Sequence, residues 1–70
     1  MRYRELARRL RKQGCEFLRQ AGGSHEIWWR PGTDMRTVVP CHSSREIPSG
    51  TLHAILNDLG LTLEDLHRGR

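Results

Sequence analysis

The sequence predicts an α+β domain: a two-layer α-β-β-β-α sandwich in which helices cover one face of a three-stranded antiparallel sheet. Two observations predict this fold. Both ends of the chain carry apolar residues at helical spacing, each as a single stripe. The middle holds three short apolar segments separated by loops of a few residues, which join antiparallel strands. Because each helix has one apolar stripe, we expect both on the same face of the sheet.

The 70 residues are expected to form one domain, residues 1–70, with no separate module for a cofactor. No apolar run approaches the ~20 residues of a membrane span, and Met1 leads directly into Arg2 instead of an apolar signal segment. No association with a membrane is therefore expected. Cys15 and Cys41 are too few for a disulfide scaffold, which favours the thiol-reducing cytoplasm and a role for both as small buried or half-buried side chains.

The positive charge is concentrated at the N-terminus. The chain has a net charge of +4, and residues 1–13, with six basic groups and one acidic group, carry +5. This segment predicts an amphipathic helix that ends at Gly14, in which Glu5 pairs with Arg9 one turn later. Its charged face is either solvated or binds an anion, and both interpretations stay open. The apolar stripe is Tyr3, Leu6, Ala7 and Leu10, and the basic arc is Arg4, Arg8, Arg9, Arg11 and Lys12.

Three strands are predicted in the middle of the chain. The first covers residues 15–20, and the paired glycines in residues 21–24 predict a turn because glycine adopts backbone angles that other residues resist. The second strand, residues 25–30, is aromatic and β-branched and is followed by a Pro-Gly pair. The third covers residues 35–39, and Pro40 is expected to terminate it.

A polar connector, Cys41 to Ile47, leads to a second helix, which Ser49 is expected to cap. Gly60 lies just past the last apolar position and is expected to end this helix. Thr62 and Asp65 have the spacing of a capping box, which predicts a short third helix over residues 63–68. The apolar stripe of the second helix is Leu52, Ile55, Leu56 and Leu59.

His25 is the strongest candidate for a catalytic side chain. It follows Gly22, Gly23 and Ser24, so an imidazole, which changes charge near physiological pH, lies beside a loop rich in backbone N–H groups. Those N–H groups can hold a phosphate oxygen, and the imidazole can move a proton on or off a ribose hydroxyl. The alternative interpretation is a histidine that only begins a strand after a turn.

No metal ion or small-molecule cofactor is expected. Cys41 and His42 form an isolated pair without the Cys-x-x-Cys or His-x-His spacing that chelates a metal. His53 and His67 fall on the predicted second and third helices and are weak candidates for a site.

Trp28 and Trp29 are neighbours in the second strand, so they face opposite sides of the sheet. One is expected in the core under the helices. The other is expected on the open face or rim, where it stacks on a base or contacts a protein partner. The sequence leaves open which tryptophan is inside.

In order and spacing, these features resemble the HicA toxin family of bacterial and archaeal toxin–antitoxin systems, over nearly the whole chain. Each motif is short, but their order in a chain of this length makes the similarity specific. The similarity is carried by Gly23-Ser24-His25, by Val39-Pro40 followed by His42, and by Gly50-Thr51-Leu52 with Ile55-Leu56 and then Gly60-Leu61.

The resemblance implies a fold like that of the double-stranded-RNA-binding domain. It also implies a ribosome-independent mRNA endonuclease that is held inactive by a HicB-type antitoxin. The catalytic histidine of the family corresponds to His25. The sequence departs from many relatives at Glu26, where they carry a second histidine, and at Trp29, where they tend to have a basic or polar residue.

As a hypothesis, His25 accepts the proton of a ribose 2′-hydroxyl, whose attack on the adjacent phosphate breaks the RNA without a metal ion. His42 is the first candidate for the second proton-transfer group. The residues expected to contact the RNA are Arg4, Arg8, Arg11 and Lys12 of the first helix, Gly22, Gly23 and Ser24 of the turn, and His42.

Two other functions stay open on the sequence. A basic helix and a small sheet suffice for a noncatalytic RNA-binding module, which binds RNA in a salt-dependent manner without cleaving it. A protein-interaction subunit, whose basic face meets an acidic antitoxin, would bind its partner and have no affinity for RNA.

Overall fold

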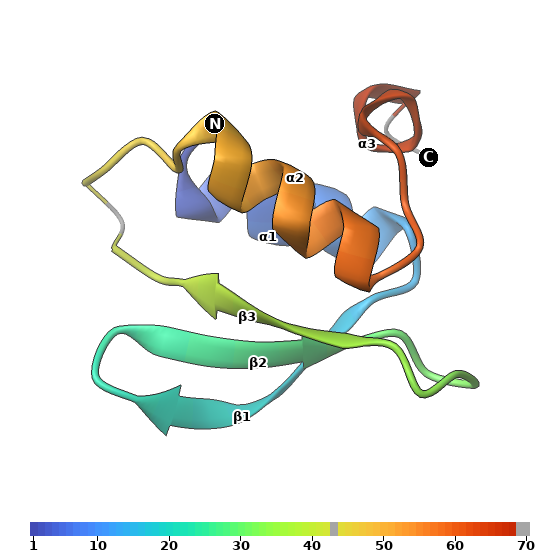
Figure 1. Cartoon of the computed structure of the whole chain (residues 1–70), viewed down its shortest axis with the longest axis horizontal. Coiled ribbons are helices and arrows are strands. Elements are labelled where there is room, and N and C mark those ends of the chain that lie inside the picture. Colours follow the sequence, from blue (N-terminus) through green and yellow to red (C-terminus); the bar gives the residue numbers. More distant parts are fainter. Residues whose placement is uncertain (43, 69–70) are drawn as a thin grey trace.

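The computed structural model describes residues 1–42 and 44–68, and its elements follow the predicted order. The sheet has the strand order β1-β2-β3, and both neighbouring pairs are antiparallel, as short connections require. The elements, drawn in Figure 1, are α1 (Tyr3–Lys12), β1 (Glu16–Gly22), β2 (His25–Trp29), β3 (Arg36–Pro40), α2 (Ser49–Asp58) and α3 (Leu63–Arg68).

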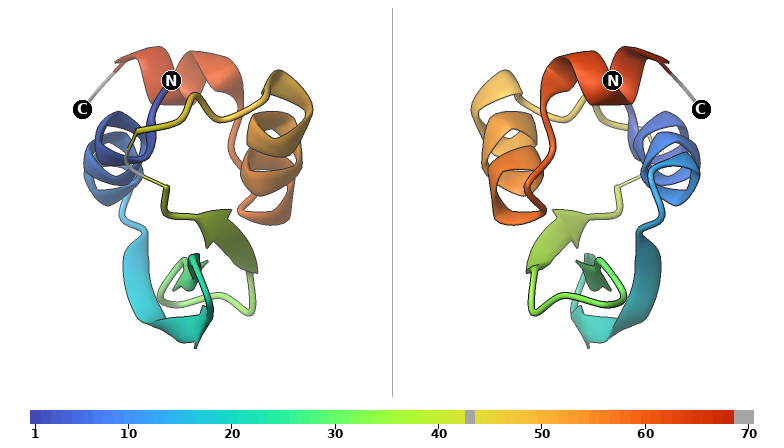
Figure 2. Two further views of the ribbon diagram at one scale, coloured as in Figure 1. Left: turned by 90° about the vertical axis from the view of Figure 1, so that its left-hand side faces the viewer. Right: turned by 90° about the vertical axis from the view of Figure 1, so that its right-hand side faces the viewer.

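The two layers of the fold are helices and sheet. Figure 2 shows α1 above the β1 side of the sheet, α2 above the β3 side, and α3 across the top. In the described part of the chain, the opposite face of the sheet carries no helix. The predicted α+β class, with the helices on one face, is therefore confirmed. None of the described helices is long and apolar enough to cross a membrane.

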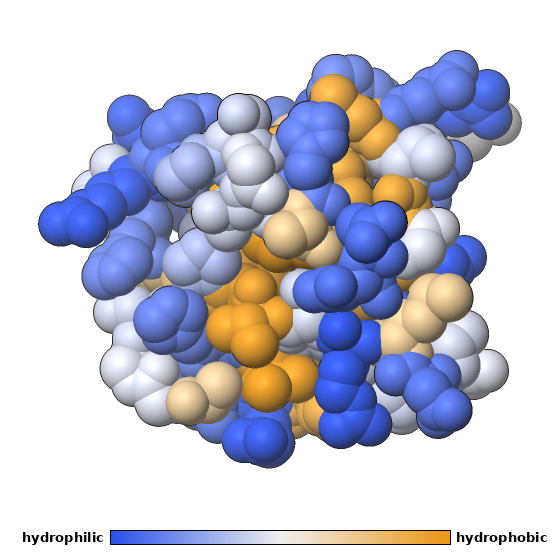
Figure 3. Space-filling view, in the orientation of Figure 1, coloured by the Kyte–Doolittle hydropathy of each residue, from blue (hydrophilic) through white to orange (hydrophobic). Residues whose placement is uncertain are grey.

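The core lies between the layers and joins the predicted apolar stripes. Trp28 is 0% exposed and is the largest fully buried side chain, whereas Trp29 is half-buried on the other side of β2. Cys15 is buried and Cys41 is half-buried, and both are free, as expected. Hydrophilic side chains cover most of the face drawn in Figure 3. The buried helical residues are Leu6, Ala7 and Leu10 of α1, Leu52, Ile55 and Leu56 of α2, and Leu66 of α3, with Leu59 directly after α2.

The first hairpin is tighter than predicted. The first strand begins one residue later than expected and continues through Gly22, which the sequence assigned to the turn, so only Gly23 and Ser24 remain between the strands. Gly22 and Gly23 have φ values of 102° and 54°, a region that favours glycine. A bulge in β1 places Phe17 opposite Trp28 and the next paired residue, Arg19, opposite Ile27.

The bounds of the other two strands and the cap of the second helix also differ from the prediction. The second strand ends at Trp29, one residue earlier than expected. The third strand is shifted by one residue and includes Pro40, which is tolerated because β3 is an edge strand. The cap predicted at Ser49 is wrong: Pro48 is the N-cap residue and makes no side-chain cap hydrogen bond. The N–H of Leu52 donates to the Pro48 carbonyl at 2.9 Å, and this bond draws Ser49 into the first helical turn.

The predicted capping box at the start of α3 is confirmed. The Thr62 N–H donates to Asp65 Oδ2 at 2.9 Å, and the Asp65 N–H donates to Thr62 Oγ1 at 3.0 Å. The hydrogen bonds from Thr62 lower the pKa of the Asp65 carboxyl. Gly60, just beyond α2, has a φ of 69° and ends the helix as expected.

Candidate active site

His25 is the first residue of β2, and its exposed side chain lies on the open face of the sheet. The alternation of side chains along β2 fixes this placement. Glu26 contacts α1 and Trp28 is buried under the helices, so His25 is on the side away from the helices. Its backbone is paired on both sides, with Gly22 of β1 and Pro40 of β3.

The turn before His25 lies beside the connector that carries His42. The Cys41 N–H donates to the Ser24 carbonyl at 2.7 Å, and His42 is the next residue. The side chain of Gln20 holds the same end of the hairpin, because its Nε2 donates to the Gly23 and His25 carbonyls at 3.1 and 2.9 Å. The structure therefore brings the glycine turn before His25 and the segment that carries His42 to the same end of the sheet.

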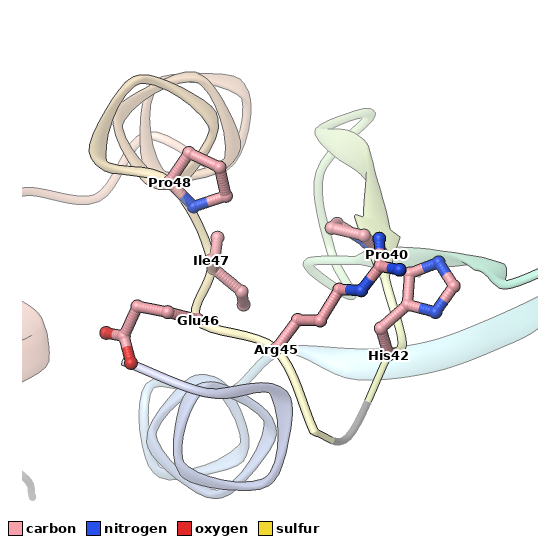
Figure 4. A pocket seen from close by; sticks show the side chains of 6 residues that line it. All are labelled: Pro40, His42, Arg45, Glu46, Ile47 and Pro48. Atoms are coloured by element: carbon pink, nitrogen blue, oxygen red, sulfur yellow. The ribbon is translucent and has the colours of Figure 1, made fainter.

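A hollow of about 200 Å³ opens in the connector at this end, next to the strand that pairs with His25. In Figure 4 the Arg45 side chain extends toward His42 and Pro40. Glu46 points the other way, and its carboxylate forms an ion pair with the N-terminal ammonium of Met1. The hollow is lined by Pro40, His42, Arg45, Glu46, Ile47 and Pro48.

Arg45, which lines this hollow with His42, was not among the residues that the sequence indicated. A guanidinium beside a histidine is suited to a phosphate group, because it presents several N–H donors and a permanent positive charge. The available signal was a cation three residues after His42 in a polar connector. Nothing in the spacing indicated that the connector folds so that the two side chains line one hollow.

The basic side chains of α1 lie in the other layer of the molecule from His25. Arg4, Arg8 and Lys12 are exposed on α1, on the helical side of the sheet. The Arg11 guanidinium lies 5.1 Å from the centroid of the Trp28 ring, so it also contributes a cation–π contact to the fold. Arg9 makes the predicted ion pair with Glu5. The sheet thus separates most of the predicted cations from the candidate catalytic group.

Glu26, the residue after His25, joins β2 to α1. The Tyr3 hydroxyl donates to Glu26 Oε1 at 2.6 Å, and Trp28 Nε1 donates to the same oxygen at 3.0 Å. Burial and the hydrogen bond to Glu26 raise the pKa of Tyr3 to about 12. Because Glu26 adjoins His25, these contacts fix the backbone from which the imidazole projects.

We expect Tyr3→Phe to destabilise the fold by about 1.5 kcal/mol at neutral pH, because the Glu26 carboxylate loses a hydrogen-bond donor. The folded-state pKa of Tyr3, about 12, exceeds its ordinary value of 10.0, so the contribution of the hydroxyl to stability is complete below pH 10 and is lost as the pH rises through about 12. Urea unfolding of both proteins at pH 8 and pH 11 measures the difference, which should shrink at pH 11. A difference that does not change with pH would contradict this role of the hydroxyl.

Within residues 1–42 and 44–68, no group of three or more His, Cys, Asp and Glu side chains is arranged to hold a metal ion. The side chains at this end of the sheet include the imidazoles of His25 and His42 and the guanidinium of Arg45. An imidazole can transfer a proton, and a guanidinium can bind an anion.

The described residues form a small α+β domain in which His25 and the segment that carries His42 and Arg45 lie at one end of an antiparallel sheet. Residues 3–61 match the family model described as the HicA toxin of bacterial toxin–antitoxin systems. The chain belongs to the HicA toxin family, as its motifs indicated. Comparisons with curated proteins and with solved structures give no match.

Proposed function

We propose that the protein is an mRNA endoribonuclease, the toxin of a pair that a HicB-type antitoxin neutralises. The observation that carries this proposal is the position of His25. It is exposed at the end of the sheet, beside the glycine turn and the connector that holds His42 and Arg45. The family match supports the role as a toxin.

The proposed reaction is an internal transfer at a phosphodiester. His25 accepts the proton of a ribose 2′-hydroxyl, the 2′-oxygen forms a bond to the adjacent phosphorus, and the bond from phosphorus to the 5′-oxygen breaks. His42 in its protonated form donates a proton to that leaving oxygen. Arg45 and the backbone N–H groups of residues 22–24 stabilise the negative charge that develops on the phosphate. The products are a 2′,3′-cyclic phosphate and a 5′-hydroxyl.

The α1 cations have a separate role in this proposal. Arg4, Arg8, Arg11 and Lys12 attract the RNA backbone, and their effect weakens with added salt. An acidic surface of the antitoxin binds the same basic side chains of α1. Because α1 and His25 lie in different layers, these cations act on phosphates away from the scissile one.

The test is cleavage of a natural mRNA by the purified chain, with the ends of the products mapped by mass spectrometry. We expect 5′-hydroxyl ends and cyclic phosphates or their hydrolysed forms. The same RNA with 2′-O-methyl groups throughout should stay intact, because it has no free 2′-hydroxyl. Cleavage of the methylated RNA, or ends with a 3′-hydroxyl, would contradict the mechanism. Salt-dependent binding without cleavage would favour the noncatalytic module, and antitoxin binding without RNA affinity would favour the interaction subunit.

A further inference from the structure

The open face of the sheet carries an apolar strip, where the exposed side of an antiparallel sheet is usually polar. Ile27 and Trp29 of β2 are half-buried on this face, and Val38 of β3 is 48% exposed. Val38 pairs directly with Ile27, and such pairs place their Cβ atoms about 5 Å apart. The three side chains therefore form a continuous surface, on the side of the sheet that Figure 2 shows without helices.

Positive charge borders this strip. Arg36 pairs with Trp29 across the β2–β3 ladder, Arg19 pairs with Ile27 across the β1–β2 ladder, and both arginines are exposed. Glu16, which pairs with Trp29, is the single carboxylate on this face among the paired residues of the described strands.

His25 lies on the same face as the strip. It precedes Trp29 by four residues on β2, which corresponds to about 13 Å along the strand. The strip is thus continuous with the candidate active site, whereas α1 and its cations are in the other layer.

The geometry points to a stacking platform for single-stranded RNA on the open sheet face, with Trp29 as its main stacking side chain and His25 at one end. This inference rests on the proposed function and extends it, because it identifies the substrate as an unpaired strand that crosses the sheet. In this arrangement one base stacks on the Trp29 ring, and the neighbouring base lies against Ile27 and Val38. Arg19 and Arg36 neutralise the phosphates of the strand. Paired bases are excluded because a duplex keeps their faces inside its own stack.

The size and charge of the strip favour RNA over a protein partner. A protein interface of standard size buries about 800 Å² on each partner around an apolar centre that is depleted of charge. The strip has three apolar side chains between two arginines and a histidine. One aromatic ring with flanking cations is sufficient for a nucleic-acid base and its phosphates.

The test measures RNA binding separately from cleavage. Every variant is made in the His25→Ala chain, so that the RNA stays intact, and binding of a fluorescein-labelled single-stranded RNA of mixed sequence is followed by fluorescence anisotropy. Trp29→Ala should weaken binding about 5- to 100-fold, and Trp29→Phe should restore most of the loss. Leu63→Ala, which removes an exposed apolar side chain on α3, is the matched control and should bind like its parent. Fully paired RNA of the same sequence should bind more weakly than the single strand.

The outcomes separate this inference from the proposed function. If Trp29→Ala and Arg36→Gln bind RNA as their parent does while the wild type cleaves mRNA, the platform is wrong and the endonuclease stands. If the wild type does not cleave but Trp29→Ala loses binding, the endonuclease is wrong and the platform stands. If Trp29→Ala binds RNA normally and loses only the antitoxin, the face is a protein-binding surface and the inference is overturned. Circular dichroism of each variant confirms that the compared chains are folded.

Discussion

His25→Ala is expected to lower the rate of RNA cleavage by a factor of about 10² to 10⁴, which is the usual contribution of a general base. The imidazole is exposed, so its removal is expected to change the free energy of unfolding by no more than about 0.5 kcal/mol. The loss is therefore chemical and not structural. The cleavage rate is measured at equal folded fraction, and induced expression of both chains in growing cells gives a second readout through mRNA integrity.

His53→Ala is the control for this experiment. His53 is an exposed histidine on α2, outside the candidate site, so its removal should leave the cleavage rate unchanged. Equal cleavage by His25→Ala and the parent would show that His25 is not the catalytic base. The proposed chemistry would then have to begin at another side chain, with His42 the first to test.

Trp28→Ala is expected to remove a large part of the stability of the protein. Replacing a fully buried tryptophan by alanine costs about 3–5 kcal/mol, and a 70-residue domain has a total stability of about 4–10 kcal/mol. The variant also loses the edge-to-face contact with Phe17, whose ring centroid is 6.5 Å from that of Trp28, and the cation–π contact with Arg11. Urea unfolding followed by far-ultraviolet circular dichroism measures the change.

Trp29→Ala is the matched control, because it makes the same substitution one residue later in the same strand. Its half-buried ring lies on the open face, so this variant should keep a cooperative unfolding transition close to that of the parent. If both substitutions cost the same stability, the assignment of Trp28 to the core and Trp29 to the open face would be wrong.

The sequence by itself determined the order of the elements and the fold class. Helical periodicity at Leu6 and Leu10, the glycines of the first hairpin, and the Thr62–Asp65 capping box act over a few residues, so the chain shows them without its tertiary contacts. The motifs were also sufficient to indicate the family, which the match over residues 3–61 confirms. The roles of His25 and of the other site residues stay predictions.

The tertiary structure decided what depends on residues far apart in the chain. Alternation shows that Trp28 and Trp29 face opposite sides, but the positions of the helices decide that Trp28 is buried. The contact of Glu26 with Tyr3 spans 23 residues, and Arg45 reaches the candidate site through the fold of the connector. The packing of α1 on the other face of the sheet likewise separates its cations from His25. Local periodicity fixes which side chains share a face, and the packing of the layers fixes which face is covered.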